Sequence, residues 1–179
     1  MPALHPLAAL AVFLALSPVS LAAPAAPPLE NLRPVCENTD GKALAADRIS
    51  ACTQMLAAKQ GDARARAFVH INRAWAYGLE KHWDLAMADY NEAAKIAPDY
   101  SMVFNEKGLA RLKMGRPDEA ILNYDKAIKL DPKSAYSLFG RGLAKGAKGN
   151  AQAAALDFEA ARALDSHVDA VFGRIGLKP

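Results

Sequence analysis

Two cysteines, four histidines and one glycine-rich segment are the residues of this chain whose chemistry could be catalytic or metal-binding. Cys36 and Cys52 are too far apart for a CxxC pair, which argues against thiol exchange and against a zinc site. The histidines form neither an HExxH motif nor an i,i+4 pair. The segment GRGLAKGAKGN at 140–150 lacks the GxxxxGK spacing of a phosphate-binding loop. We therefore expect no enzyme, no cofactor and no metal.

Charged residues recur along the chain at intervals of 34 residues. One register holds Arg73, Lys107 and Arg141, and a second holds Asp89, Asn123 and Asp157. One interpretation is a basic ladder that receives an acidic partner. The other is an ion pair or hydrogen bond within each unit, and we favour it because each base has an acceptor available in its own unit.

The same interval governs the apolar residues, so the charged positions belong to a repeated structural unit. The segment GRPDEAILNYDKAIKLDP at 115–132 has the start, stop and spacing of an amphipathic helix. It returns upstream as KHWDLAMADYNEAAKIAP and downstream as GNAQAAALDFEAARALDS. In register stand small residues at 74, 108 and 142, alanines at 86, 120 and 154, and aromatic residues at 90, 124 and 158. Each helix pair leaves an apolar face that the next pair must cover, which predicts a solenoid.

This set of motifs resembles the tetratricopeptide repeat family. The resemblance covers three units, at 67–100, 101–134 and 135–168, and implies an all-α, right-handed solenoid of antiparallel helix pairs. A partial unit at 42–66 is expected to cap the N-terminal end, after an irregular segment at 23–41. Residues 169–179 are expected to cap the C-terminal end, because an open end would expose apolar surface.

The first helices of such a solenoid line its concave surface, and here their residues predict a groove for an extended peptide or an amphipathic helix. The predicted lining residues are Phe68, Ile71, Trp75, Leu79, Met102, Asn105, Leu109, Leu112, Tyr136, Phe139 and Leu143. We expect Trp75 to be the principal anchor. An alternative is that the N-terminal segment or the C-terminal helix fills the groove.

Some members of the family hold acidic chain ends with a clamp of lysine, asparagine and arginine. The matching positions in this chain hold Ile71, Trp75, Glu106, Tyr136 and Gly140. The resemblance therefore does not imply that co-chaperone activity.

The first 22 residues have the layout of a secretory signal peptide, with an apolar run followed by small residues. Cleavage is expected after Ala22, with Ala25 as the next choice, and an uncleaved membrane anchor is the alternative. Export would favour a disulfide between Cys36 and Cys52, because disulfides persist in oxidising compartments. In a reducing compartment the pair would be two free thiols.

Charge and resemblance together define the expected function. The formal net charge of +3 is spread without a Lys/Arg block, so no nucleic-acid partner is expected. The resemblance implies a non-catalytic scaffold that binds a protein or peptide. The signal-like segment predicts that it acts in the periplasm or cell envelope, without membrane contact beyond that segment. The alternatives are a structural subunit that self-associates through the groove and a catalytically silent accessory subunit of an envelope enzyme.

Overall fold

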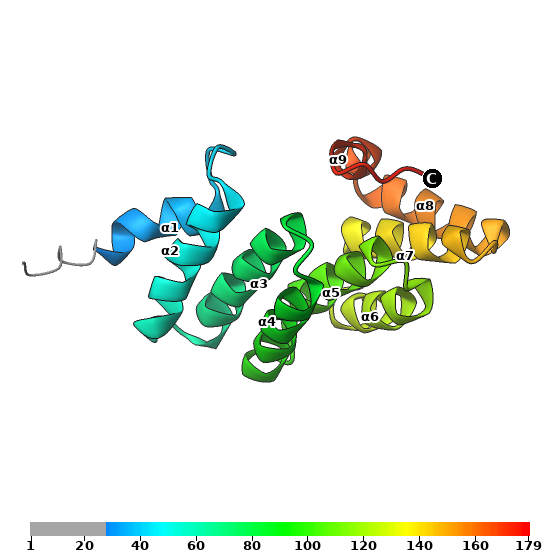
Figure 1. The fold of residues 1–179 in the computed structure, drawn as a ribbon. Helices are drawn as coiled ribbons and strands as arrows, with labels where there is room; N and C mark the ends of the chain where they lie inside the picture. The colour runs from blue at the N-terminus through cyan, green and yellow to red at the C-terminus, as the bar shows by residue number, and fades with distance from the viewer. Residues whose placement is uncertain (1–27) are drawn as a thin grey trace, which may run out of the picture.

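The computed structural model describes residues 28–179, so the predicted signal peptide lies outside the described residues. The described residues form helices and no strands, which confirms the predicted all-α fold. Figure 1 shows an elongated array in which successive helices pack side by side. The helices are α1 (Leu29–Glu37), α2 (Ala45–Ala57), α3 (Ala63–Leu79), α4 (Trp83–Ile96), α5 (Ser101–Lys113), α6 (Pro117–Leu130), α7 (Ala135–Ala147), α8 (Ala151–Leu164) and α9 (Val168–Arg174).

The three repeated segments fold as the pairs α3–α4, α5–α6 and α7–α8, which are the most extensive helix contacts in the described chain. A residue in the left-handed conformation lies in the turn inside each pair. These residues are Lys81, Gly115 and Gly149, with φ of 61°, 71° and 80°. Glycine adopts this conformation at no steric cost, whereas a lysine there costs about 1–2 kcal/mol. The first pair therefore keeps the turn geometry although a lysine stands where the other two pairs have glycine.

Aromatic residues of the second helices fill the space between successive pairs. Tyr124 of α6 is fully buried and lies between Gly108 of its own repeat and Gly140 of the next. A Cβ atom added at Gly140 would lie 2.4 Å from Cζ of Tyr124, and one added at Gly142 would lie 2.7 Å from Cε1 of Phe158. Since these distances are shorter than any van der Waals contact, the glycines allow the neighbouring helices to approach the rings.

The segment expected to be irregular at 23–41 contains a helix, α1, and that part of the prediction was wrong. The run from Pro24 to Pro28 suggested irregular chain, but further along Leu32 and Cys36 lie one turn apart and are buried. This apolar pair packs with Cys52 and Val69 and supplies the tertiary contacts that a short helix needs. The helix α1 therefore pairs with α2, and the partial unit has its own first helix.

A disulfide joins this N-terminal pair. The sulfurs of Cys36 in α1 and Cys52 in α2 are 2.06 Å apart, and both residues are fully buried. At the other end of the array, the short helix α9 lies beside α7 and α8 (Figure 1). Its residues Val168 and Phe172 are buried and join the cluster that contains Tyr124 and Phe139. Each end of the described array is thus closed by a helix outside the three repeats.

Candidate functional site

A hollow of about 430 Å³ lies where the first helices of the three repeats meet the terminal helices. We call it the central hollow. Residues of α1, α2, α3, α5, α7 and α9 line it, together with the residues that follow α1 and α9. They are Glu37, Asn38, Arg48, Phe68, Ile71, Asn72, Trp75, Met102, Asn105, Glu106, Leu109, Tyr136, Val171, Phe172 and Ile175. Because three successive repeats contribute, the hollow is a product of the solenoid and of no single repeat.

The structure brings seven of the eleven predicted groove residues together in the central hollow. These are Phe68, Ile71, Trp75, Met102, Asn105, Leu109 and Tyr136. Of these, Met102 is 38% and Tyr136 is 43% exposed, so apolar surface at the hollow is open to solvent. The first helices do supply the lining, as their spacing predicted.

The other four predicted residues lie elsewhere, and their placement corrects the prediction. Phe139 is fully buried, with its ring centroid 4.8 Å from that of Phe172, because α9 covers this part of α7. Leu143 is also a buried core residue, and Leu112 packs against the same cluster. Leu79 is 55% exposed at the end of α3 and borders a separate, smaller cavity. Helical spacing placed all four on the right helices but could not show which neighbour covers them.

Several residues of the central hollow were not predicted. The wall formed by Val171 and Phe172 of α9 and by Ile175, the residue that follows it, comes from a segment that matches no complete repeat. The alternative in which the C-terminal helix fills the groove holds only in part, because α9 covers Phe139 but lines the rest of the hollow and leaves it open. Arg48, only 3% exposed, comes from α2, and its Nε donates a hydrogen bond to the carbonyl oxygen of Cys36.

A chain of hydrogen bonds runs from the start of α7 to Asn105 and Glu106 of α5, which line the central hollow. Ser137 Oγ lies 2.9 Å from Ser134 Oγ and donates to Asn105 Oδ1 over 3.1 Å. The amide of Asn105 donates in turn to Glu106 Oε1 over 3.0 Å. Burial raises the pKa of Glu106 to about 6, although the bond from Asn105 and the nearby Lys113 ammonium act in the opposite direction. A carboxylate therefore lies in otherwise largely apolar surroundings.

Trp75, the expected anchor, is partly buried and contributes to two cavities. It borders the central hollow on one side and the smaller cavity around Leu79 and Trp83 on the other. The ammonium of Lys113 lies 4.8 Å from the centroid of its ring, within the range of a cation–π contact. The indole therefore separates the two cavities.

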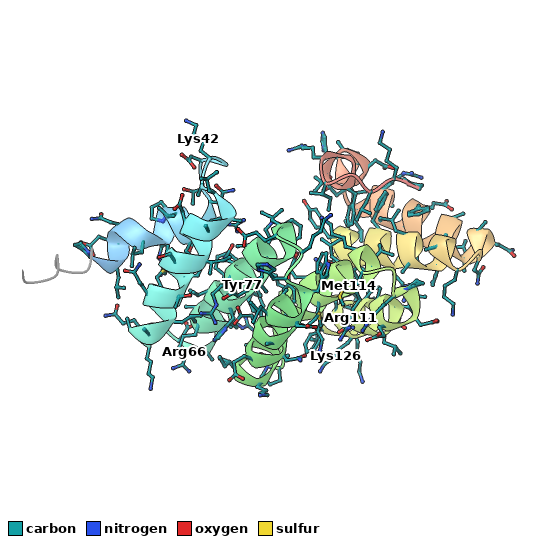
Figure 2. The ribbon with its side chains drawn as sticks, in the orientation of Figure 1. Lys42, Arg66, Tyr77, Arg111, Met114 and Lys126 are labelled. Atoms are coloured by element: carbon teal, nitrogen blue, oxygen red, sulfur yellow. A yellow bond between two sulfur atoms is a disulfide. The ribbon has the colours of Figure 1, made fainter. Side chains whose placement is uncertain are left out.

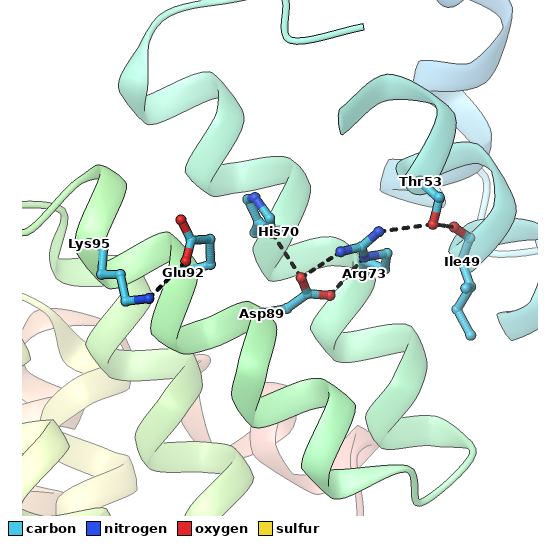
Figure 3. A network of polar contacts seen from close by, with 7 residues as sticks. All are labelled: Ile49, Thr53, His70, Arg73, Asp89, Glu92 and Lys95. Atoms are coloured by element: carbon cyan, nitrogen blue, oxygen red, sulfur yellow. Dashed lines mark hydrogen bonds and ion pairs between the residues drawn. The ribbon is translucent and has the colours of Figure 1, made fainter. Parts of the chain in front are cut away.

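In the first repeat, the recurring base and acid form an ion pair (Figure 3). Arg73 Nε and Nη2 donate to the two carboxylate oxygens of Asp89, each over 2.8 Å. His70 Nδ1 lies 2.8 Å from the same carboxylate, and Arg73 Nη1 donates to Thr53 of α2 over 3.0 Å. Burial alone would raise the pKa of Asp89, but the bonds from Arg73 and His70 outweigh burial and hold the pKa below its ordinary value.

The third repeat has the same arrangement. Arg141 Nε and Nη2 donate to Asp157 over 2.9 and 2.7 Å, and Nη1 donates to Asp125 over 2.8 Å. Lys145 Nζ lies 2.8 Å from Asp157. The interpretation of an ion pair within the unit is confirmed for the first and third repeats. The middle repeat differs, since its Asn123 amide donates to the backbone oxygen of Glu119.

The described residues include neither a group of side chains suited to bind a metal ion nor a helix suited to span a membrane. Between residues 28 and 179, no three His, Cys, Asp or Glu side chains are grouped so that they could hold a metal ion. None of the helices in this range combines the length and the apolar character that a membrane span requires.

Comparison with known proteins supports the repeats that the sequence predicts. The profile of the family described as "TPR repeat" matches residues 108–149. No curated protein matches the sequence. Similar solved structures include "Crystal structure of MamA", with 22% identity and a TM-score of 0.64, covering 77% of this chain and 78% of that one.

Two further structures have the same fold. "Crystal structure of MamA protein" is 20% identical, with a TM-score of 0.63 and coverage of 84% of this chain and 78% of that chain. "MamA RS-1 ArsTM double mutant" is 14% identical, with a TM-score of 0.62 and coverage of 82% and 84%. At these identities the likeness concerns the fold. With three units in one register and a profile match across the joint of the second and third, the chain contains tetratricopeptide repeats.

Proposed function

We propose that this chain is a non-catalytic scaffold that binds another protein, or a peptide segment of it, in the central hollow. The observation that carries the proposal is the convergence of accessible apolar and aromatic side chains from three repeats on one hollow. Apolar surface gathered in this way is typical of a groove that receives an extended or helical segment. Phe68, Trp75, Met102 and Tyr136 would contact its apolar side chains.

We further propose that the scaffold acts in the periplasm or another part of the cell envelope. Support comes from the apolar run that precedes Ala22 and from the Cys36–Cys52 disulfide, a bond that persists in oxidising compartments. The intact mass of the natively expressed protein tests this proposal. Loss of residues 1–22 is expected, and a soluble cytoplasmic protein that retains them would contradict export.

The groove is tested with a partner recovered by crosslinking from the cell envelope. Trp75→Ala and Tyr136→Ala should each weaken its binding by about tenfold or more, because large aromatic residues at an interface centre carry disproportionate binding energy. Leu122→Ala is the matched control, since Leu122 is 69% exposed on α6 and lies outside the hollow. It should leave the affinity unchanged.

The same variants separate binding from packing when their melting temperatures are measured in parallel. If Trp75 is only a core residue, Trp75→Ala will lower stability by about 3 kcal/mol or more and keep its affinity in the cold. Lost affinity with a retained melting temperature supports the groove. Retained affinity in both aromatic variants would contradict it.

A structural subunit that self-associates is the second candidate function. Leu122 and Leu156 occupy the same register on α6 and α8 and are 69% and 65% exposed. Leu130 and Leu164, also in one register, are 38% and 47% exposed near the ends of the same helices. Light scattering at increasing concentration should show a dimer or larger species that Leu122→Glu abolishes. A monomer at every concentration would contradict this candidate.

A further inference from the structure

Each repeat places the same set of positions between its first and second helix. The base lies at 73, 107 or 141, a second side chain one turn later at 77, 111 or 145, and the acid at 89, 123 or 157. We call this set the charge slot of the repeat. In the first and third repeats an aspartate carboxylate occupies the slot and accepts two hydrogen bonds from the arginine.

The charge slot of the middle repeat has the bases but no carboxylate. Asn123 replaces the aspartate, and its amide group bonds to its own helix through the Glu119 backbone oxygen at 2.7 Å. The neighbouring Asp125, which supports Arg141 in the third repeat, has Asn91 as its counterpart one repeat earlier. Asp157 and Asp125 neutralise the third slot, and asparagines occupy both corresponding positions at the middle slot.

Three cations surround the middle slot. Lys107 and Arg111 lie one turn apart on α5, and Lys126 lies one turn after Asn123 on α6, with its ammonium 3.8 Å from the centroid of the Phe104 ring. Figure 2 labels the side chains of Arg111 and Lys126 on this pair of helices. Across residues 28–179, neither Lys107 nor Lys126 has a carboxylate within ion-pair distance.

Among the described residues, the ion pairs of these three cations involve one acid, Glu119. Glu119 lies 3.2 Å from Arg111 Nη1 and 3.6 Å from Arg116 Nη1, so one carboxylate is shared by two arginines. The buried Nε of Arg111 finds no hydrogen-bond acceptor within residues 28–179. Burial and the charges of Arg111 and Lys126 lower the pKa of Lys107, with Glu119 acting in the opposite direction. These observations describe mutual repulsion that a bound anion would relieve.

We propose that Lys107, Arg111 and Lys126 form a binding site for a carboxylate supplied by an acidic segment of a partner protein. A carboxylate matches the shape and charge of the slot, because an aspartate carboxylate fills the equivalent slot in the two neighbouring repeats. None of the three residues lines the central hollow, so this site is separate from the proposed groove. A partner that uses both would place apolar side chains in the hollow and an acidic residue at the slot.

The test uses nuclear magnetic resonance of the isotope-labelled protein at low salt, with capped tetraglutamate as the probe and capped tetraglutamine as its neutral counterpart. Tetraglutamate should produce saturable shifts in α5 and α6 that added salt reverses, and tetraglutamine should produce none. Tetraglutamine with a free C-terminus tests whether a terminal carboxylate suffices, and inorganic phosphate tests a different anion. Saturation by phosphate without binding of either carboxylate peptide would overturn the proposal.

Asn123→Asp is the decisive variant, because it supplies the missing acid from within the chain. It should raise the melting temperature and weaken tetraglutamate binding by about tenfold or more.

Lys107→Ala and Lys126→Ala should weaken binding similarly, whereas Lys95→Ala, which removes an exposed lysine from α4, should not. Trp75→Ala should bind tetraglutamate normally even if the groove proposal fails. Binding to Asn123→Asp at the wild-type affinity would overturn the proposal, as would equal losses in the Lys95 and Lys126 variants.

Discussion

The Asp89 carboxylate, 5% exposed, shows how much one residue contributes inside a repeat. Asp89→Asn leaves Arg73, whose side chain is only 19% exposed, without its charged partner. We expect a loss of about 3 kcal/mol in the free energy of unfolding, because breaking a buried ion pair leaves an uncompensated charge. Urea denaturation measures this loss.

The control for Asp89 lies one turn further along the same helix (Figure 3). Glu92 is half-exposed and pairs with Lys95 at 3.1 Å, a contact of the kind that contributes less than about 0.5 kcal/mol. Glu92→Gln should therefore leave the unfolding free energy nearly unchanged. Equal losses in the two variants would show that burial of the pair does not matter.

Glu106 has the opposite effect on stability, since its folded-state pKa is raised from 4.5 to about 6 by burial. Below pH 4.5 both the folded and the unfolded carboxyl are protonated, and burial carries no ionisation penalty. Between pH 4.5 and 6 the unfolded state releases its proton and the folded state retains it, so stability falls as the pH rises. Above pH 6 a deficit of about 2 kcal/mol persists.

Glu106→Gln removes this ionisation and should be more stable than the wild type by about 1–2 kcal/mol at pH 7. The groups that face Glu106 are Asn105 and Lys113 of its own helix and the hydroxyls of Tyr90 and Tyr124. All of them are kept in the variant. Chemical denaturation at several pH values gives the difference between the two proteins. Parallel profiles from pH 4 to pH 7 would contradict the raised pKa.

The elements pack through small residues, and Gly140 is the tightest of these contacts. Gly140→Ala would place a methyl group 2.4 to 2.6 Å from three atoms of Tyr124, two of them in the ring. We expect a loss of about 1–3 kcal/mol, because overpacking forces the ring or the helix to shift. The matched control is Gly146→Ala in the same helix, where the new methyl group would meet only Ala154 Cβ at 3.8 Å. That substitution should stabilise α7 by about 0.5–1 kcal/mol. The melting temperatures of the two variants test this prediction. A raised melting temperature in both Gly140→Ala and Gly146→Ala would contradict the tight packing at Gly140.

The repeated helices and the two terminal caps were predictable from sequence, but the helix α1 and the contacts that α9 makes were not. A fixed interval of 34 residues places small, aromatic and charged residues of α3 to α8 in register, so their pairing could be derived without coordinates. The helix α1 depends on a disulfide and on Leu32 meeting α2, which no period records. The burial of Phe139 depends on α9, a helix of only seven residues whose packing the sequence pattern does not record. Contacts made by the terminal helices therefore account for the missed helix α1 and for the burial of Phe139.

At the scale of the molecule, the Cys36–Cys52 bond should stabilise one end and leave the other unaffected. Its partners are 16 residues apart, and closing a loop of this length contributes about 3 kcal/mol in the chain-entropy model. Stability in a solenoid is close to a sum over neighbours. We therefore expect reduction to lower the hydrogen-exchange protection of α1 and α2 and to leave that of α5 to α8 nearly unchanged.

Two controls accompany that experiment. The Cys36→Ser/Cys52→Ser double variant should show the same local loss and no response to reductant. Thiol labelling of the unreduced, denatured protein should find no free cysteine. Uniform loss of protection along the chain, or two reactive thiols, would contradict the prediction.

The seating of Tyr124 against Gly140 has a consequence for how this chain can lengthen or shorten during evolution. Tyr90 precedes Glu106 by the same sixteen residues that separate Tyr124 from Gly140. A gene that lost the codons for 101–134 would therefore bring Tyr90 against Gly140, and the new joint would use the same pair of residue types as the old one. The shortened protein would keep a matched joint but lose Asn105 and Glu106 from the lining of the hollow. Duplication or deletion of whole units can thus change what the molecule recognises while preserving how its helices stack.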